Sequence, residues 1–139
     1  MLKKTITYTD FDGNQVTEDF YFNLTKAEIA EMEVSTEGGY ANMLQKIGQS
    51  KNGAEIMHLF KSFILNSYGI KSEDGKRFKK SKEISEEFEQ SAAYDELFTE
   101  MITNADEAIK FVSGIFPFSD DQRKEFLQRA KTTELPSET

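Results

Sequence analysis

The chain has 139 residues and contains no cysteine, no tryptophan and a single histidine. The lack of cysteine excludes disulfides, zinc fingers, iron–sulfur clusters and thiol catalysis, and it is compatible with a reducing compartment. The one histidine, His58, stands among apolar residues in a helical pattern, whereas a catalytic imidazole needs a positioned partner and a substrate cleft. A packed or half-exposed side chain is therefore the favoured interpretation of His58.

Long apolar segments and a net positive charge are also missing. No apolar run approaches the roughly 18 residues of a membrane span, and the start MLKKTITYTD lacks the apolar core of a signal peptide. The 17 basic and 25 acidic residues give a net charge of −8, which excludes a general basic surface for nucleic acid. We expect a protein that contacts neither a membrane nor nucleic acid and that remains in the compartment where it is made.

Motifs of catalysis and metal binding are absent as well. The sequence has no glycine-rich phosphate loop, no G-x-S-x-G motif and no histidine or cysteine cluster. The segment DFDGN at 10–14 shares the acidic spacing of a calcium loop, but Gly13 stands at its fourth position and Tyr21 replaces the glutamate of its twelfth. The other carboxylates are spread along helical faces, as on solvated surfaces. We expect no enzymatic activity, no cofactor and no metal site.

What the sequence does contain begins with a strand pattern that predicts a β-hairpin over residues 3–24. Apolar side chains fall on even positions, namely Ile6, Tyr8, Val16, Phe20, Phe22 and Leu24. Because a two-residue turn would pair even positions with odd ones, the pattern favours an odd loop at 12–14, with Ile6 opposite Phe20. A hairpin is marginal alone, so we expect its apolar face to pack on helices.

Three helices are predicted after the hairpin. Thr25 and Glu28 form a capping box at the start of the first, with Leu24 and Ile29 in the positions of a hydrophobic staple. A second helix is expected over 40–48. A third, over 53–68, is apolar almost all round and is therefore expected to be the central core helix, with Gly69 just after its C-terminus.

The second half of the chain is also predicted to be mainly helical. Residues 70–81 are polar, and Asp74-Gly75 indicates an exposed turn or small hairpin. Helical spacing resumes at Lys82 and continues through 91–117, with the 94–102 part expected to pack on the third helix. Asn104, followed by two acidic residues, favours two helices that meet there. Gly114 and Pro117 are expected to end the second of these helices. Ser119 and Gln122 form a capping box that predicts the start of a last helix.

Together these elements predict one α+β domain that is mostly α-helical, with an N-terminal β-hairpin packed on a bundle of about five to seven short helices. We expect the domain to span residues 1–131, with the hairpin at 3–24 and the helices within 26–131. Residues 132–139 are expected to form a flexible tail.

Charge is segregated along the chain. Residues 71–82 carry six basic and two acidic side chains, whereas residues 83–107 carry nine acidic and no basic ones. The basic run is either a contact to nucleic acid or to an acidic partner, or a solvated loop that complements the acidic helices. Its candidate contact residues are Lys76, Arg77, Lys79 and Lys80. The shortness of the run and the acidity of the whole chain favour the solvated loop.

The turn GIFPFSDD places Ile115, Phe116 and Phe118 around Pro117. Such a group is either a hinge packed into the core or an exposed anchor for another chain, and large apolar residues are more often buried. This end of the helical stretch, including Phe111, is nevertheless the part of the sequence that we predict to meet a partner protein.

Three blocks of the sequence together resemble the small tail assembly chaperones of long-tailed phages and prophages of Gram-positive bacteria. They are TITYTDFDGNQVTEDFYFNLTKAEIAEME, FKSFILNSYGIKSEDGKRFKKS and SAAYDELFTEMITNADEAIKFVSGIFP. The resemblance implies a non-enzymatic protein that binds the tape measure protein in the host cytoplasm, keeps it soluble and helps to recruit tail tube protein. It further implies absence from the finished virion and possible self-association. It assigns no role to any single residue.

Two other functions are compatible with the residues. A small acidic phage protein could inhibit a host nuclease or DNA-binding protein through its acidic helices. An enzyme would have to use the scattered carboxylates with a divalent metal ion.

Overall fold

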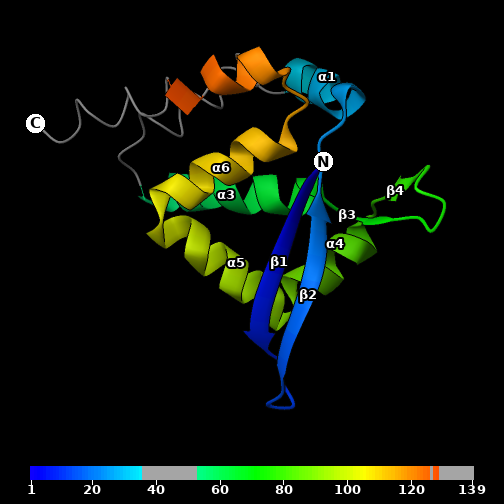
Figure 1. Cartoon of the computed structure of the whole chain (residues 1–139), viewed down its shortest axis with the longest axis vertical. Helices are drawn as coiled ribbons and strands as arrows, with labels where there is room; N and C mark the ends of the chain where they lie inside the picture. The colour runs from blue at the N-terminus through cyan, green and yellow to red at the C-terminus, as the bar shows by residue number, and fades with distance from the viewer. Residues whose placement is uncertain (36–52, 126, 129–139) are drawn as a thin grey trace, which may run out of the picture.

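A computed structural model describes residues 1–35, 53–125 and 127–128 of the chain (Figure 1). Its elements are β1 (Leu2–Thr9), β2 (Gln15–Phe22), α1 (Lys26–Ser35), α3 (Gly53–Ser67), β3 (Tyr68–Lys71), β4 (Phe78–Lys79), α4 (Lys82–Glu89), α5 (Ala92–Thr103) and α6 (Ala105–Ile115). Residues 120–125 and 127–128 are also helical. The helix predicted at 40–48 and the tail predicted at 132–139 lie outside the described residues.

The strands form one antiparallel sheet in the order β1-β2-β3-β4. Strand β3 pairs only with the last two residues of β2, through Gly69 opposite Tyr21 and Tyr68 opposite Phe22. Most of the β1–β2 hairpin is therefore two-stranded, and it crosses in front of α4 and α5 (Figure 1). The short β3–β4 hairpin projects to the other side of β2. The predicted mostly helical α+β fold with an N-terminal hairpin is confirmed.

The register of the first hairpin differs from the prediction by two residues. Even positions do pair with even ones, but Ile6 lies opposite Glu18 and Phe20 lies opposite Lys4. The loop comprises residues 11–13, because the Asp10 carboxylate accepts the backbone N–H of both Asp12 and Asn14, at 3.0 and 2.8 Å. Gly13 takes the left-handed conformation, with φ of 86°, that closes such a three-residue loop.

The apolar face of the hairpin forms the centre of the core, as expected. Phe22 is fully buried, and its ring lies 5.8 Å from that of Phe88 and 5.1 Å from that of Phe111, both in edge-to-face geometry. Tyr68 stacks on Phe88 at 4.1 Å. Strand β2 is thus connected through aromatic contacts to β3, α4 and α6, which fixes the position of these elements around the hairpin.

An ion-pair triad joins the hairpin to two helices. Lys4, on the apolar face of β1, places its Nζ 2.8 Å from Glu100 of α5 and 3.3 Å from Glu107 of α6. Burial alone would lower the pKa of Lys4, but the hydrogen bonds to the two carboxylates hold it above the ordinary value. The hydrogen bond from Lys4 likewise lowers the pKa of Glu107. Lys4 therefore fixes the junction of α5 and α6 against β1.

The predicted helix starts are confirmed by their hydrogen bonds. Glu28 and Thr25 exchange the two bonds of a capping box, from Thr25 N to Glu28 Oε1 at 2.9 Å and from Glu28 N to Thr25 Oγ1 at 3.1 Å. Asn104 caps α6 through Glu107 N, so that the long stripe is divided into α5 and α6 as expected. Ser119 and Gln122 form the last capping box.

The region after α3 differs from the prediction. Gly69 is a buried residue of β3 and does not end α3 as a left-handed cap, because residues Tyr68–Lys71 continue directly into the sheet.

The turn at Asp74-Gly75 closes the predicted small hairpin, with Gly75 at a φ of 75°. Helix α3 buries Phe60, Phe63 and Ile64 as a core helix should, but its other side is exposed at Met57 and His58.

Candidate interaction surfaces

The predicted partner-binding group lies mostly in the core. Ile115 is fully buried, Phe111 and Phe116 are each 2% exposed, and Phe118 is half-buried. The Phe116 ring lies 5.8 Å from that of Phe63, and the Ile115 carbonyl accepts the N–H of Leu24 at the end of the hairpin. Contact between a partner and these three buried residues would require the fold to open.

The turn around Pro117 is fixed by side chains that follow it. Arg123 donates from Nε to the Ser113 carbonyl at 3.1 Å and from a terminal guanidinium nitrogen to the Phe116 carbonyl at 3.5 Å. The Phe118 ring stacks on Phe116 at 5.5 Å. Of the two alternatives for this turn, the structure therefore agrees with a hinge packed into the core. Contact with a partner stays a prediction for Phe118.

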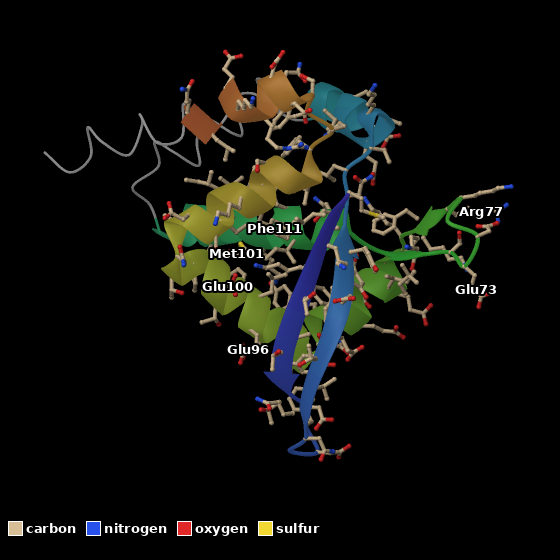
Figure 2. All side chains as sticks on the ribbon, in the orientation of Figure 1. Glu73, Arg77, Glu96, Glu100, Met101 and Phe111 are labelled. Carbon is tan, nitrogen blue, oxygen red and sulfur yellow. The ribbon has the colours of Figure 1, made fainter. Side chains whose placement is uncertain are left out.

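The predicted basic loop is the tip of the β3–β4 hairpin. Its shape comes from Asp74, whose carboxylate accepts from Ser72 Oγ at 2.6 Å and from Lys76 N at 3.0 Å. The hydrogen bond from Ser72 also lowers the pKa of Asp74. Lys76, Arg77 and Lys79 are exposed. Figure 2 shows Arg77 and Glu73 at the tip, well away from the helices.

Lys80 does not belong to the exposed part of this loop. Its Nζ lies 2.7 Å from Glu28 Oε2, 2.6 Å from the Asn23 carbonyl and 2.9 Å from the Asn66 carbonyl. Burial alone would raise the pKa of Glu28, but hydrogen bonds from Lys80 and Thr25 hold it below its ordinary value. Lys80 therefore connects β4 to the start of α1 and the end of α3.

Some of the carboxylates on α4, α5 and the start of α6 form ion pairs, and others do not. Glu89 pairs with Lys61, Glu86 with Lys82, and Glu100 and Glu107 with Lys4. Within the described ranges, five exposed carboxylates have no ion pair: Glu83, Glu87, Asp95, Glu96 and Asp106. The Lys82–Glu86 pair, 3.9 Å apart, lies within α4 itself, so among the described residues no ion pair joins the exposed residues Lys76, Arg77 and Lys79 to the acidic helices.

Several large apolar side chains are exposed, and sequence reasoning missed them. Met57 on α3 and Ile102 on α5 are 43% and 39% exposed, although periodicity assigned both to buried stripes. Helix α3 begins, and α5 ends, on the same side of the molecule (Figure 1). Ile70 on β3 and Phe11 at the hairpin tip are exposed as well. Periodicity could not separate these positions, because both helices are apolar over more than one face.

In the part of the chain that the structure describes, no group of three or more histidine, cysteine, aspartate or glutamate side chains is arranged to hold a metal ion. No helix in the same part has the length and apolar character needed to cross a membrane.

The fold and its surfaces define a small α+β domain with a projecting basic hairpin and an acidic helical side. The sequence model of the phage tail assembly chaperone family matches residues 1–138, and the chain belongs to this family. Comparison with curated proteins and with solved structures gives no significant match. The family suggested by the three sequence blocks is thus confirmed, while an origin among phages of Gram-positive bacteria stays a prediction.

Proposed function

We propose that this tail assembly chaperone binds the tape measure protein, keeps it soluble and helps to recruit tail tube protein around it. The match to the family over residues 1–138 carries this proposal, since the family defines a role in tail assembly with phage tail proteins as partners. The protein acts by binding and not by catalysis. Its place of action is the bacterial host cytoplasm, and it is absent from the mature virion.

The physical properties of the surface suit such a role. A tape measure chain presents apolar helical faces before the tube encloses it, and these faces need cover from other apolar side chains. Met57, Ile102 and the half-buried Phe118 offer such contacts on the chaperone. The exposed carboxylates of α4 and α5 contribute to the net charge of −8 of the chaperone, and this charge opposes aggregation.

The basic hairpin tip offers a second contact. Lys76, Arg77 and Lys79 project from an acidic protein and fit an acidic surface. A second copy of the chain offers such a surface, because its α4 and α5 carry exposed carboxylates without an ion pair among the described residues. Contact between the tip of one copy and these helices of another would produce self-association.

Co-purification tests the assignment of partners. The chaperone is expressed with an affinity tag beside the tape measure protein, and separately beside the tail tube protein, both from the same phage genome. We expect the tape measure protein to be retained at both low and high salt, because apolar contacts dominate. Recovery of neither protein would contradict the proposed function.

The charge of α4 and α5 also supports the alternative of an inhibitor that binds a host nuclease or DNA-binding protein. Binding through exposed carboxylates weakens steeply with ionic strength, since exposed charges are screened beyond about 8 Å at physiological salt. A salt series therefore separates the two functions. A tight complex with a basic host protein that dissociates at high salt would favour the inhibitor.

A further inference from the structure

Among the described residues, the outer edge of β1 pairs with no further strand. The backbone N–H of Asp10 donates to the Asn14 carbonyl, so these two residues form a hydrogen-bonded pair. Hydrogen-bonded and non-bonded pairs alternate along an antiparallel ladder, and Leu2, Lys4, Ile6 and Tyr8 therefore bond to β2. The intervening residues direct their N–H and C=O groups away from β2. They are Lys3, Thr5, Thr7 and Thr9.

These outward groups have no partner in the described chain. All four residues are exposed, and no hydrogen bond between described residues reaches their backbone groups. The alternation also predicts that odd-numbered residues at the end of β2 point away from β1. Asn23 agrees with this, because its N–H donates to the Ser67 carbonyl on the other side. The 5–9 part of the edge also contains no proline, no charged residue and no bulge, which are features that commonly protect edge strands from pairing.

A strand added here would lie above α5. Helix α5 packs on β1, and Figure 1 shows it continuing past β1 on the side away from β2. Glu100 on α5 contacts Lys4 on the face of β1 that packs against this helix. Glu96 lies one turn earlier in α5, on the same side of the helix as Glu100. Glu96 is exposed and has no ion pair among the described residues, and Figure 2 shows both glutamates beside β1.

We infer that the edge of β1 binds an extended segment of another polypeptide that carries lysine or arginine at alternate positions. Such a segment would complete a backbone ladder with Thr5, Thr7 and Thr9. Its basic side chains would face α5 and meet Glu96, while its other side chains would align with the threonines on the solvent face. Threonine and other β-branched residues are favoured in such cross-strand pairs.

A second copy of the chain fits this edge less well. Pairing of β1 with β1 of another copy would place the two α5 helices close together on the same face of the joined sheet. Both helices carry unpaired carboxylates at Asp95 and Glu96, so the contact would bring like charges together. The edge of β1 would recognise the extended conformation and the basic side chains of the segment, whichever tail protein supplies it.

The test uses isotope-labelled full-length protein and a short synthetic peptide that alternates lysine with threonine. A peptide that alternates glutamate with threonine is its control. We expect the lysine peptide to slow amide hydrogen exchange at Thr5, Thr7 and Thr9 by roughly tenfold, as one added hydrogen bond per amide implies. The amides of Thr17 and Asp19, on the opposite edge of the hairpin, should be unchanged.

Two matched variants locate the site. Thr7 and Thr17 face each other across the hairpin with 2.9 Å between their hydroxyl oxygens, and the N–H of each points to an outer edge. Thr7→Pro should abolish peptide binding, whereas Thr17→Pro disturbs the same rung and should preserve it. Glu96→Gln, which keeps the strand intact, should weaken binding severalfold, while Glu87→Gln on α4 should not.

Three results would overturn the inference. The lysine peptide could leave the exchange of the odd β1 amides unchanged, or the glutamate peptide could bind equally well. Alternatively, the protein could sediment as a dimer that Thr7→Pro alone dissociates, which would make a second copy the occupant of the edge.

Discussion

Lys80 and Glu28 are 52 residues apart in the sequence, yet their side chains form an ion pair with 2.7 Å between Nζ and Oε2. The other oxygen of Glu28 accepts the backbone N–H of Thr25, the residue that caps the start of α1. One carboxylate thus serves both the cap of α1 and the amine of Lys80. Since Lys80 also reaches the Asn23 and Asn66 carbonyls, this pair joins the hairpin, α1, α3 and β4.

Replacement of Lys80 by methionine should lower stability. The variant keeps the approximate length of the side chain, but the half-buried Glu28 carboxylate loses its cation and the Asn23 and Asn66 carbonyls lose the hydrogen bonds from Lys80. We expect a loss of about 1–3 kcal/mol in the free energy of unfolding, measured by urea denaturation. The control is Lys79→Met at the exposed neighbouring position, which should change stability by less than about 0.5 kcal/mol. Equal effects of the two substitutions would refute the structural role of Lys80.

The same carboxylate predicts a dependence of stability on pH. The folded protein holds the pKa of Glu28 below its ordinary value of 4.5, so Glu28 stabilises the fold above that value. This contribution is lost as the pH falls through the lowered pKa. The difference in unfolding free energy between the native protein and Glu28→Gln should therefore shrink as pH is lowered from about 7 to about 3. A difference that stays constant over this range would contradict the assignment.

Gly69 should tolerate no side chain. A Cβ at this position would lie 2.9 Å from the Lys79 carbonyl oxygen and 2.7 Å from the Phe78 ring, so Gly69→Ala must shift β4. We expect a loss of about 1–3 kcal/mol, as for other overpacked sites. In Gly114→Ala, by contrast, the nearest atom is the end of the flexible Leu2 side chain, at 2.9 Å, and the helix gains an alanine. Thermal unfolding should show the larger decrease for Gly69→Ala.

The aromatic turn can be divided by two substitutions. Phe116→Ala should lose about 3–5 kcal/mol of stability, because its ring is buried against Phe63. Phe118→Ala should lose less, since Phe118 is half-buried. If Phe118 contacts the tape measure protein, this variant keeps its circular dichroism spectrum but retains less of that protein in co-purification. Unchanged retention would remove Phe118 from the contact surface.

Local signals in the sequence predicted the helix boundaries well. Thr25 with Glu28, Asn104 and Ser119 with Gln122 were recognisable because a capping side chain and its acceptor or donor lie within one turn. The even-position pattern likewise predicted which face of the hairpin is buried. These features need no knowledge of distant residues.

Features that depend on distant contacts were mispredicted or missed. The hairpin register shifted because Asp10, an unremarkable acidic residue in the sequence, closes the loop one residue earlier. Lys80 looked like its basic neighbours, since its acceptors Asn23, Glu28 and Asn66 are remote in the chain. The open edge of β1 was equally hidden, because a strand pattern shows which side chains face the core but not how many neighbours the strand has.

The chaperone function is tested most directly by the solubility of the tape measure protein expressed with and without this protein in bacterial cells. The measured quantity is the fraction of tape measure protein that remains in the supernatant after lysis and centrifugation. We expect most of the tape measure protein to be soluble when the chaperone is present and to co-elute with it on size-exclusion chromatography. A tape measure protein that is equally insoluble with and without the folded chaperone would contradict this function.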